Sequence, residues 1–231
     1  MTGILQNLII GIQTGAVYAL IAVGYTMVYG VLRLINFAHG DVYMIGAFVG
    51  LTLANRFGNG ADSPAGFAAI FILTLTISAL FGMLIEWAAY RPLRKAPRIT
   101  ALITAIGVSL LLEALAQLVW GAAPQFFRTL DLFNLPTLRL GGLELNQKYL
   151  LILATSLLLM VALWYVVTRT RTGKAMRAVS FDRDAAALMG INVNQIISFT
   201  FALGSALAAA AGLLVCAVTN VKIDPYIGIL P

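Results

Sequence analysis

Long apolar stretches alternate with short polar segments along most of this 231-residue chain. A membrane-spanning helix needs about 20 mostly apolar residues, and lipid favours helices because irregular backbone would leave its amides unpaired. The second apolar stretch, with 13 residues, is short for a straight span. The pattern predicts about six spanning helices, at residues 5–31, 42–54, 66–90, 99–120, 149–168 and 193–218.

The composition indicates that lipid surrounds the chain. Hydrophobic residues make up 61% of it and charged residues only 10%, whereas a soluble domain has about 25% charged residues. We therefore expect an all-α, polytopic integral membrane protein with a single domain over residues 1–231. A formal charge of +6 would suggest nucleic acid in a soluble protein. Here the basic residues gather in short loops, which is a signal of topology instead.

The distribution of basic residues predicts the orientation of the chain. If the N-terminus is outside, the inside loops are 32–41, 91–98 and 169–192, and they hold ten of the fifteen Lys and Arg residues. The segment "RPLRKAPR" supplies four of them, Arg91, Arg94, Lys95 and Arg98. Because cytoplasmic loops are enriched in Lys and Arg, we expect the N-terminus outside. The outside loop 121–148 is expected to be a turn region.

The segment "NFAHGD" joins the first two predicted spans and contains the only histidine of the chain. His39 and Asp41 alone cannot form a zinc site, which requires three or four ligands. We expect a structural junction instead. Asn36 would end the first helix, Gly40 would permit a tight backbone, and Asp41 would be the N-cap of the second helix.

Polar residues within the spans are candidates for a translocation path. Thr14, Tyr18 and Tyr25 share one side of the first helix by their spacing. This face serves either as packing between helices or as the wall of a polar path. Glu113 lies inside the fourth span, where an ionised carboxylate facing lipid is costly. It is either a functional group or a structural hydrogen-bonding partner, whereas Glu86 is expected to form an ion pair near Arg91 and Arg94.

The inside loop 169–192, "RTRTGKAMRAVSFDRDAAALMGIN", is basic at its start and amphipathic. It predicts a short helix over residues 181–189 that ends at Gly190, a residue type favoured after helix C-termini. Such a helix either lies on the membrane surface or docks a soluble partner. The fragment "TGK" is not a phosphate loop, because Ala175 follows Lys174 where Ser or Thr is required. No common hydrolase or metalloprotease motif is present, so we expect no catalysis by this chain.

Three blocks of sequence resemble the branched-chain amino acid permeases of ABC transporters, of the Liv type. They are "GAVYALIAVGYTMVYGVLRLINFAHGDVYMIGAF", the pair "AYRPLR" and "TALITAIGVSLLLE", and the loop "RTRTGKAMRAVSFDRDAAALMGINV". The resemblance covers nearly the whole chain. It implies a multi-pass permease subunit of the bacterial inner membrane, without a cofactor of its own. Urea and short-chain amide permeases share much of the pattern, so the substrate stays open between these classes.

The resemblance also implies partners. They are a homologous permease, two cytoplasmic ATPases that use ATP, and a periplasmic substrate-binding protein. Asp184, Ala185, Ala186 and Gly190 match the spacing of the E-A-A-x-x-x-G element with which importers dock on their ATPases, with Asp in place of Glu. The distal part of that pattern is missing after Gly190. We therefore expect 169–192 to be the coupling loop.

Two other readings stay open. An independent proton- or ion-coupled carrier would use Glu113 as its protonation site and would need no ATPase. Permeases of this type usually continue beyond "IDPYIGILP", so the chain is expected to be truncated at its C-terminus, which favours a scaffold subunit without a complete path.

Overall fold

The computed structural model describes residues 2–32, 36–94, 96–127, 137–140, 143–219 and 222–226. Of the basic residues in the predicted inside loops, Arg33 and Lys95 lie outside these ranges, as does the end of the chain after residue 226. The elements are α1 (Thr2–Leu32), α2 (His39–Phe57), the short turn η1 (Gly58–Asp62), α3 (Pro64–Ile85), the π-helical turn η2 (Glu86–Tyr90), η3 (Arg91–Leu93), α4 (Arg98–Trp120), β1 (Thr137–Leu140), β2 (Leu143–Asn146), α5 (Gln147–Arg169), α6 (Arg171–Phe181), α7 (Arg183–Leu188) and α8 (Val193–Thr219).

The described part of the chain is almost entirely helical, as the sequence predicts. Five stretches are long and apolar enough to cross a membrane: Ile4–Leu32, Pro64–Leu93, Ile99–Trp120, Leu150–Arg169 and Val193–Val218. Large apolar side chains on these helices are highly exposed, for example Leu118 at 83% and Leu158 at 68%. Exposed apolar surface of this extent is unfavourable in water. The chain is therefore a multi-pass membrane protein.

The second predicted span differs from the other five. It is helical over a longer range, from His39 to Phe57, but it is not among the stretches apolar enough to cross a membrane by themselves. Most of its residues are buried against protein, including Met44 and Phe48. Neighbouring helices thus replace lipid around α2, which is why it tolerates polar residues. The count of six spans and the outside N-terminus stay predictions.

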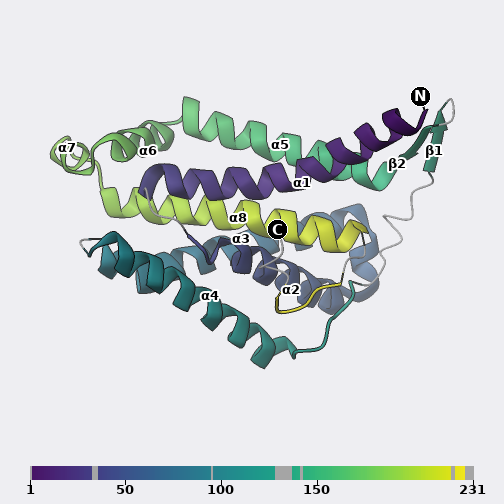
Figure 1. Cartoon of the computed structure of the whole chain (residues 1–231), viewed down its shortest axis with the longest axis horizontal. Helices are drawn as coiled ribbons and strands as arrows, with labels where there is room; N and C mark the ends of the chain where they lie inside the picture. The colour runs from purple at the N-terminus through teal and green to yellow at the C-terminus, as the bar shows by residue number, and fades with distance from the viewer. Residues whose placement is uncertain are drawn as a thin grey trace.

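Helix α8 forms the centre of the bundle, and it contacts α1, α2, α3 and α5 (Figure 1). Small residues on both sides allow this close packing. A Cβ atom on Gly46 of α2 would collide with Ala209 of α8, and one on Gly82 of α3 would collide with Ser205. In lipid, such small-residue contacts let helix backbones approach and gain van der Waals energy.

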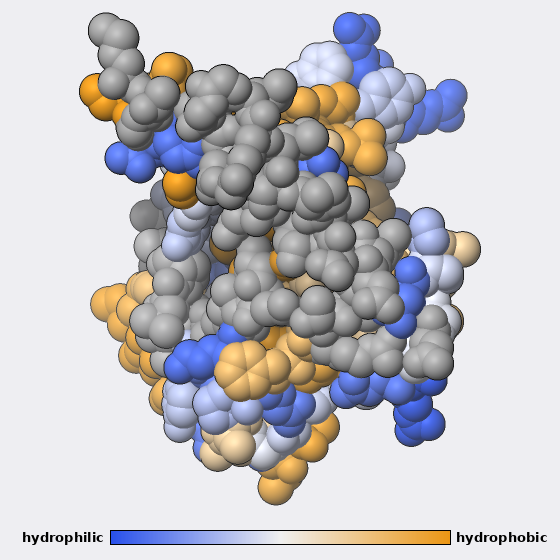
Figure 2. Space-filling view, turned by 90° about the vertical axis from the view of Figure 1, so that its right-hand side faces the viewer, coloured by the Kyte–Doolittle hydropathy of each residue, from blue (hydrophilic) through white to orange (hydrophobic). Residues whose placement is uncertain are grey.

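The two ends of the bundle differ in structure. Helices α6 and α7 project at one end, whereas the antiparallel hairpin of β1 and β2 lies at the other (Figure 1). Figure 2 looks onto the hairpin end, where hydrophobic residues reach the surface at several places between hydrophilic ones. The hairpin falls within the predicted turn region 121–148, of which residues 128–136, 141 and 142 lie outside the described residues.

Candidate functional site

The polar side chains of the "NFAHGD" junction are buried inside the bundle. Asn36, His39 and Asp41 are 7%, 3% and 2% exposed. Residues 36–38 form a turn that the His39 N–H closes by donating to the Asn36 carbonyl at 3.2 Å. The Asn36 side chain accepts a hydrogen bond of 2.6 Å from the Tyr90 hydroxyl. Gly40 lies in the first turn of α2, and the role of these residues as a structural junction stays a prediction.

The predicted N-cap at Asp41 is wrong. Helix α2 begins at His39, its N-cap position is Ala38, and no side chain caps it. The turn at residues 36–38 starts the helix three residues earlier than the sequence suggests, which leaves Asp41 within the first helical turn. Its carboxylate therefore does not cap the helix and interacts with other residues instead.

The side chain of His39 packs against α1. Its ring donates a hydrogen bond to the backbone of Ile21 and lies edge-on to Tyr25, with 5.8 Å between the ring centroids. A Cβ on Gly24 would come within 3.2 Å of the His39 ring. The small residue on α1 thus makes room for the histidine, and Tyr25 of the predicted path meets a residue of the predicted junction.

Asp41 and Glu113 come together between α2 and α4. The Asp41 carboxylate forms a side-chain hydrogen bond with Ser109 and lies close enough to Glu113 to interact electrostatically. Glu113 is 7% exposed, so neither carboxylate faces lipid. Within the described residues, Oδ2 of Asp41 has no hydrogen-bonding partner. The pair is an unusual concentration of acid groups for an apolar bundle.

The other two path candidates lie elsewhere. Thr14 and Tyr18 are exposed on the outer face of α1, and Tyr18 is 52% exposed. The Thr14 hydroxyl donates to the Ile10 carbonyl at 3.0 Å within its own helix. Of the four candidates, Glu113 is buried and Tyr25 is half-buried, whereas Thr14 and Tyr18 are exposed, and their role in a path stays a prediction.

The 169–192 loop folds into two helices. Asp182 separates them and caps α7, because its carboxylate accepts hydrogen bonds from the N–H groups of Asp184 and Ala185 at 2.9 and 3.0 Å. The single helix predicted over 181–189 is thus too long, since α7 covers only Arg183–Leu188 and residue 181 ends α6. The expected glycine terminator is correct, because Gly190 has a φ of 82°, a conformation that favours glycine.

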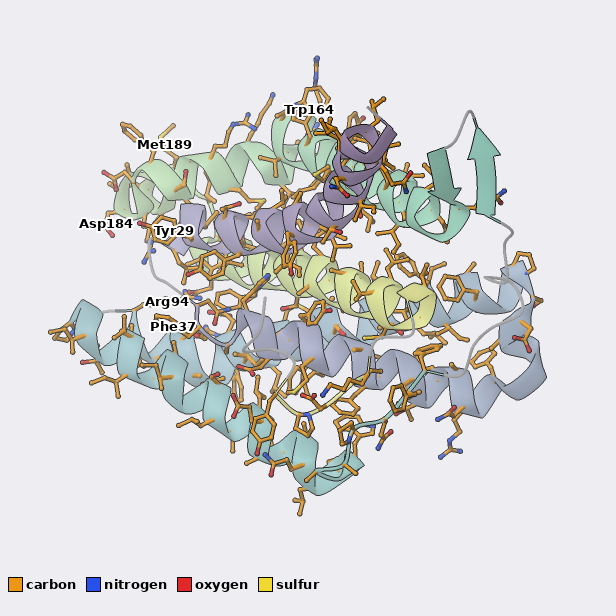
Figure 3. All side chains as sticks on the ribbon, turned by 45° about the vertical axis from the view of Figure 1, so that its right-hand side comes forward. Tyr29, Phe37, Arg94, Trp164, Asp184 and Met189 are labelled. Carbon is orange, nitrogen blue, oxygen red and sulfur yellow. The ribbon has the colours of Figure 1, made fainter. Side chains whose placement is uncertain are left out.

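The E-A-A-like residues present a surface at the end of the bundle (Figure 3). Ala186 is buried at 4% exposure, whereas Asp184 and Ala185 are exposed. Around them, a groove of about 480 Å³ is lined by Ala178, Phe181, Asp182, Ala185, Ala186, Met189 and Ile191. Phe181, Leu188 and Met189 are 85%, 89% and 84% exposed. This is an apolar patch on the segment that the sequence marks as cytoplasmic.

The described residues contain no group of three or more His, Cys, Asp or Glu side chains that could hold a metal ion. The geometry has two features: buried polar side chains at the junction and exposed apolar side chains at the end of α7.

The chain matches the family described as branched-chain amino acid transport system / permease component, over residues 7–229. It belongs to this family. It is 41% identical over 232 residues to the high-affinity branched-chain amino acid transport system permease protein BraD of Pseudomonas aeruginosa, a match that covers 98% of this chain and 75% of that protein. The corresponding protein LivH of Escherichia coli (strain K12) is 39% identical, with 98% and 74% covered.

A more distant relative is the probable branched-chain amino acid transport permease protein LivH of Methanocaldococcus jannaschii. It is 30% identical over 204 residues, which cover 84% of this chain and 60% of that protein. No solved structure matches the chain. The chain is thus a permease, as the sequence resemblance indicates.

Two connections in this permease include contacts that were not predicted from the sequence. Arg183, the first residue of α7, donates a hydrogen bond to the Leu32 carbonyl at 2.5 Å, at the end of α1. The second connection is a buried polar network at the same end. Arg94 pairs with Glu86 and donates to Asn194, while Ser198 donates to Glu86 at 2.6 Å.

Only part of this network had a signal in the sequence. The pairing of Glu86 with Arg94 is the expected ion pair, since the two residues are close along the chain. The contacts of Arg183, Asn194 and Ser198 join segments far apart in sequence, and no local pattern marks them.

Proposed function

We propose that the chain is the permease subunit of an ATP-driven ABC importer for branched-chain amino acids, located in the bacterial inner membrane. The observation that carries this proposal is the match to the permease family over residues 7–229. The matches to BraD and LivH cover nearly the whole chain. Both proteins are named as branched-chain amino acid permeases, which supports this substrate class over the related amides.

The partners follow from the same proposal. A homologous permease completes the translocation path, two cytoplasmic ATPases bind at α7, and a periplasmic protein delivers substrate. The docking role of Asp184, Ala185, Ala186 and Gly190 is supported by the exposed apolar patch around them, because a patch of large apolar side chains in water usually marks a protein interface. Thr14 and Tyr18, on the outer face of α1, are candidates for a path wall shared with the partner permease.

The chain itself needs no cofactor under this proposal. Gly173 and Lys174, from the fragment that superficially resembles a phosphate loop, lie inside helix α6. A phosphate loop must present successive backbone N–H groups to the nucleotide. Here the Gly173 N–H donates to the Thr170 hydroxyl at 3.0 Å, and the Lys174 N–H donates to the Thr170 carbonyl at 3.1 Å. ATP would therefore be bound and hydrolysed by the partner ATPases.

A second function, a proton-coupled carrier, is favoured by one observation. Asp41 and Glu113 are buried acids in electrostatic contact, and intramembrane acids of this kind serve as proton relays in some transporters. Under this alternative, the variant Glu113→Gln abolishes uptake driven by a proton gradient. Uptake that depends on ATP and is insensitive to the gradient would remove this alternative.

The test of the importer compares valine substitutions at two glycines that both have a positive φ angle. Gly190 next to α7 has a φ of 82°, and Gly121 at the end of α4 has a φ of 88°. Valine is strained at both positions. We expect Gly190→Val to uncouple uptake from ATP hydrolysis in proteoliposomes that contain all subunits, while the chain still inserts into the membrane.

The matched variant Gly121→Val lies away from α6 and α7, at the other end of α4. It should retain the ratio of substrate transported to ATP hydrolysed. If Gly190→Val keeps that ratio as well, α7 does not couple the chain to an ATPase.

A further inference from the structure

Helix α6 carries two rows of side chains on opposite faces. Gly173, Met176 and Val179 are buried, and they face a bundle in which α6 contacts α1, α5 and α8. Arg171 and Lys174 are exposed and are offset from the buried row by about two residues. At about 100° per residue, this offset turns them roughly 200° away from the bundle. The basic row therefore points outward.

This basic row begins where a membrane span ends. The apolar stretch of α5 is Leu150–Arg169, and α6 starts two residues later. Trp164 and Tyr165 near the end of that span are 56% and 58% exposed, and Figure 3 shows Trp164 on the outer surface of α5. Exposed Trp and Tyr rings are typical of the headgroup level of a bilayer.

All charged side chains at the end of α5 and in α6 are basic. Residues 150–181 contain no Asp or Glu. The Arg169 guanidinium lies 6.0 Å from the centroid of the Trp164 ring, so one basic side chain is already held at the aromatic level. Arg177 differs from its neighbours, because it donates a hydrogen bond to the Val167 carbonyl and closes the α5–α6 corner.

We propose that Trp164, Arg169, Arg171 and Lys174 form a binding face for the phosphate groups of anionic phospholipids in the leaflet where α5 ends. We call these four residues the α6 basic face. Clusters of Lys and Arg directly after a membrane span attract anionic lipid, and here a helix buried on its opposite side holds them in place. Bound lipid thereby fixes α6, which leads into α7 through the single residue Asp182. The inference goes beyond the proposed function and does not depend on it.

The test measures which lipid lies next to Trp164. The full chain with Trp87→Phe and Trp120→Phe is reconstituted into vesicles of phosphatidylcholine with phosphatidylglycerol, and the quenching of Trp164 fluorescence by the brominated form of either lipid is compared. We expect brominated phosphatidylglycerol to quench more strongly at equal mole fraction. In R171Q/K174Q the preference should fall by about fivefold for each charge removed, the factor that corresponds to about 1 kcal/mol per basic residue near the membrane surface.

The control variant R56Q/K222Q removes the same charge from exposed residues outside the α6 basic face, and it should keep the preference. Equal quenching by both lipids in the parent chain would overturn the proposal, as would a preference that survives in R171Q/K174Q. Weaker retention of ATPases by R171Q/K174Q with an unchanged lipid preference would also overturn it, because the face would then bind protein. Native mass spectrometry of the chain with all its tryptophans, which counts retained phosphatidylglycerol, gives the same comparison without the Trp→Phe changes.

Discussion

The start of α2 and the end of α7 reverse the usual arrangement of polar and apolar residues. At the start of α2, Asn36, His39 and Asp41 are buried. At the end of α7, Leu188 and Met189 are almost fully exposed. The polar side chains of the first region can be buried because other helices of the same chain supply their partners. The second is apolar although none of the residues that the structure describes covers it, so we expect its energetic role to lie in what it contacts outside the chain. Changes in the first should act on stability, and changes in the second on assembly.

The largest effect is expected from breaking the buried ion pair at η2. Glu86→Ala leaves the Arg94 guanidinium without its carboxylate and removes the acceptor of Ser198. Loss of one partner of a buried pair costs about 3–5 kcal/mol, so the free energy of unfolding should fall by that amount. Thermal denaturation of the detergent-solubilised chain, followed by circular dichroism, measures it. The exposed neighbour Arg91→Ala is the control, and equal midpoints for both variants would contradict the prediction.

A smaller effect is expected at the junction itself. Asn36→Leu leaves the buried Tyr90 hydroxyl without the acceptor that it now contacts at 2.6 Å. An unsatisfied buried group costs about 1–3 kcal/mol. The conservative partner change Tyr90→Phe removes the donor, and the double variant closes a mutant cycle. A coupling energy near zero would show that the two side chains do not stabilise each other.

The cap of α7 should contribute less and act locally. Asp182→Ala removes the acceptor of two backbone N–H groups, a loss typically of about 0.5–2 kcal/mol. Faster hydrogen exchange at the amides of Asp184 and Ala185 would report it. Asp184→Ala, which removes an exposed carboxylate from the same turn, should leave exchange nearly unchanged. Equal protection in both variants would argue against the cap.

The smallest change in stability is expected where the residues are most exposed. Leu188→Ser combined with Met189→Ser should alter the free energy of unfolding by less than about 0.5 kcal/mol, because neither side chain is buried. Retention of the ATPases on the purified complex should nevertheless fall. Leu118→Ser changes a similarly exposed leucine on α4 and should keep the ATPases bound. Normal retention in the α7 variant would remove the assembly role of this surface.

The sequence predicted what depends on local pattern. Apolar runs identified five spans, and the glycine at position 190 identified the end of α7. The start of α2 was misplaced because a three-residue backbone turn, with no side-chain signature, decides it. The contact of Asp41 with Glu113 and the bond from Arg183 to α1 depend on which helices become neighbours. Hydropathy carries no such information, because lipid and protein interiors are equally apolar.

The central position of α8 has a consequence for the synthesis of the chain. Gly46 of α2 fits against Ala209, yet α2 leaves the ribosome long before α8. At translation rates of 5–20 residues per second, the interval between them is roughly 10–30 s. During that time α2, with its polar first turn, has no central helix to pack against and must be held by the insertion machinery or by its earlier neighbours. We therefore expect the packing of α8 to be the late step that completes the bundle.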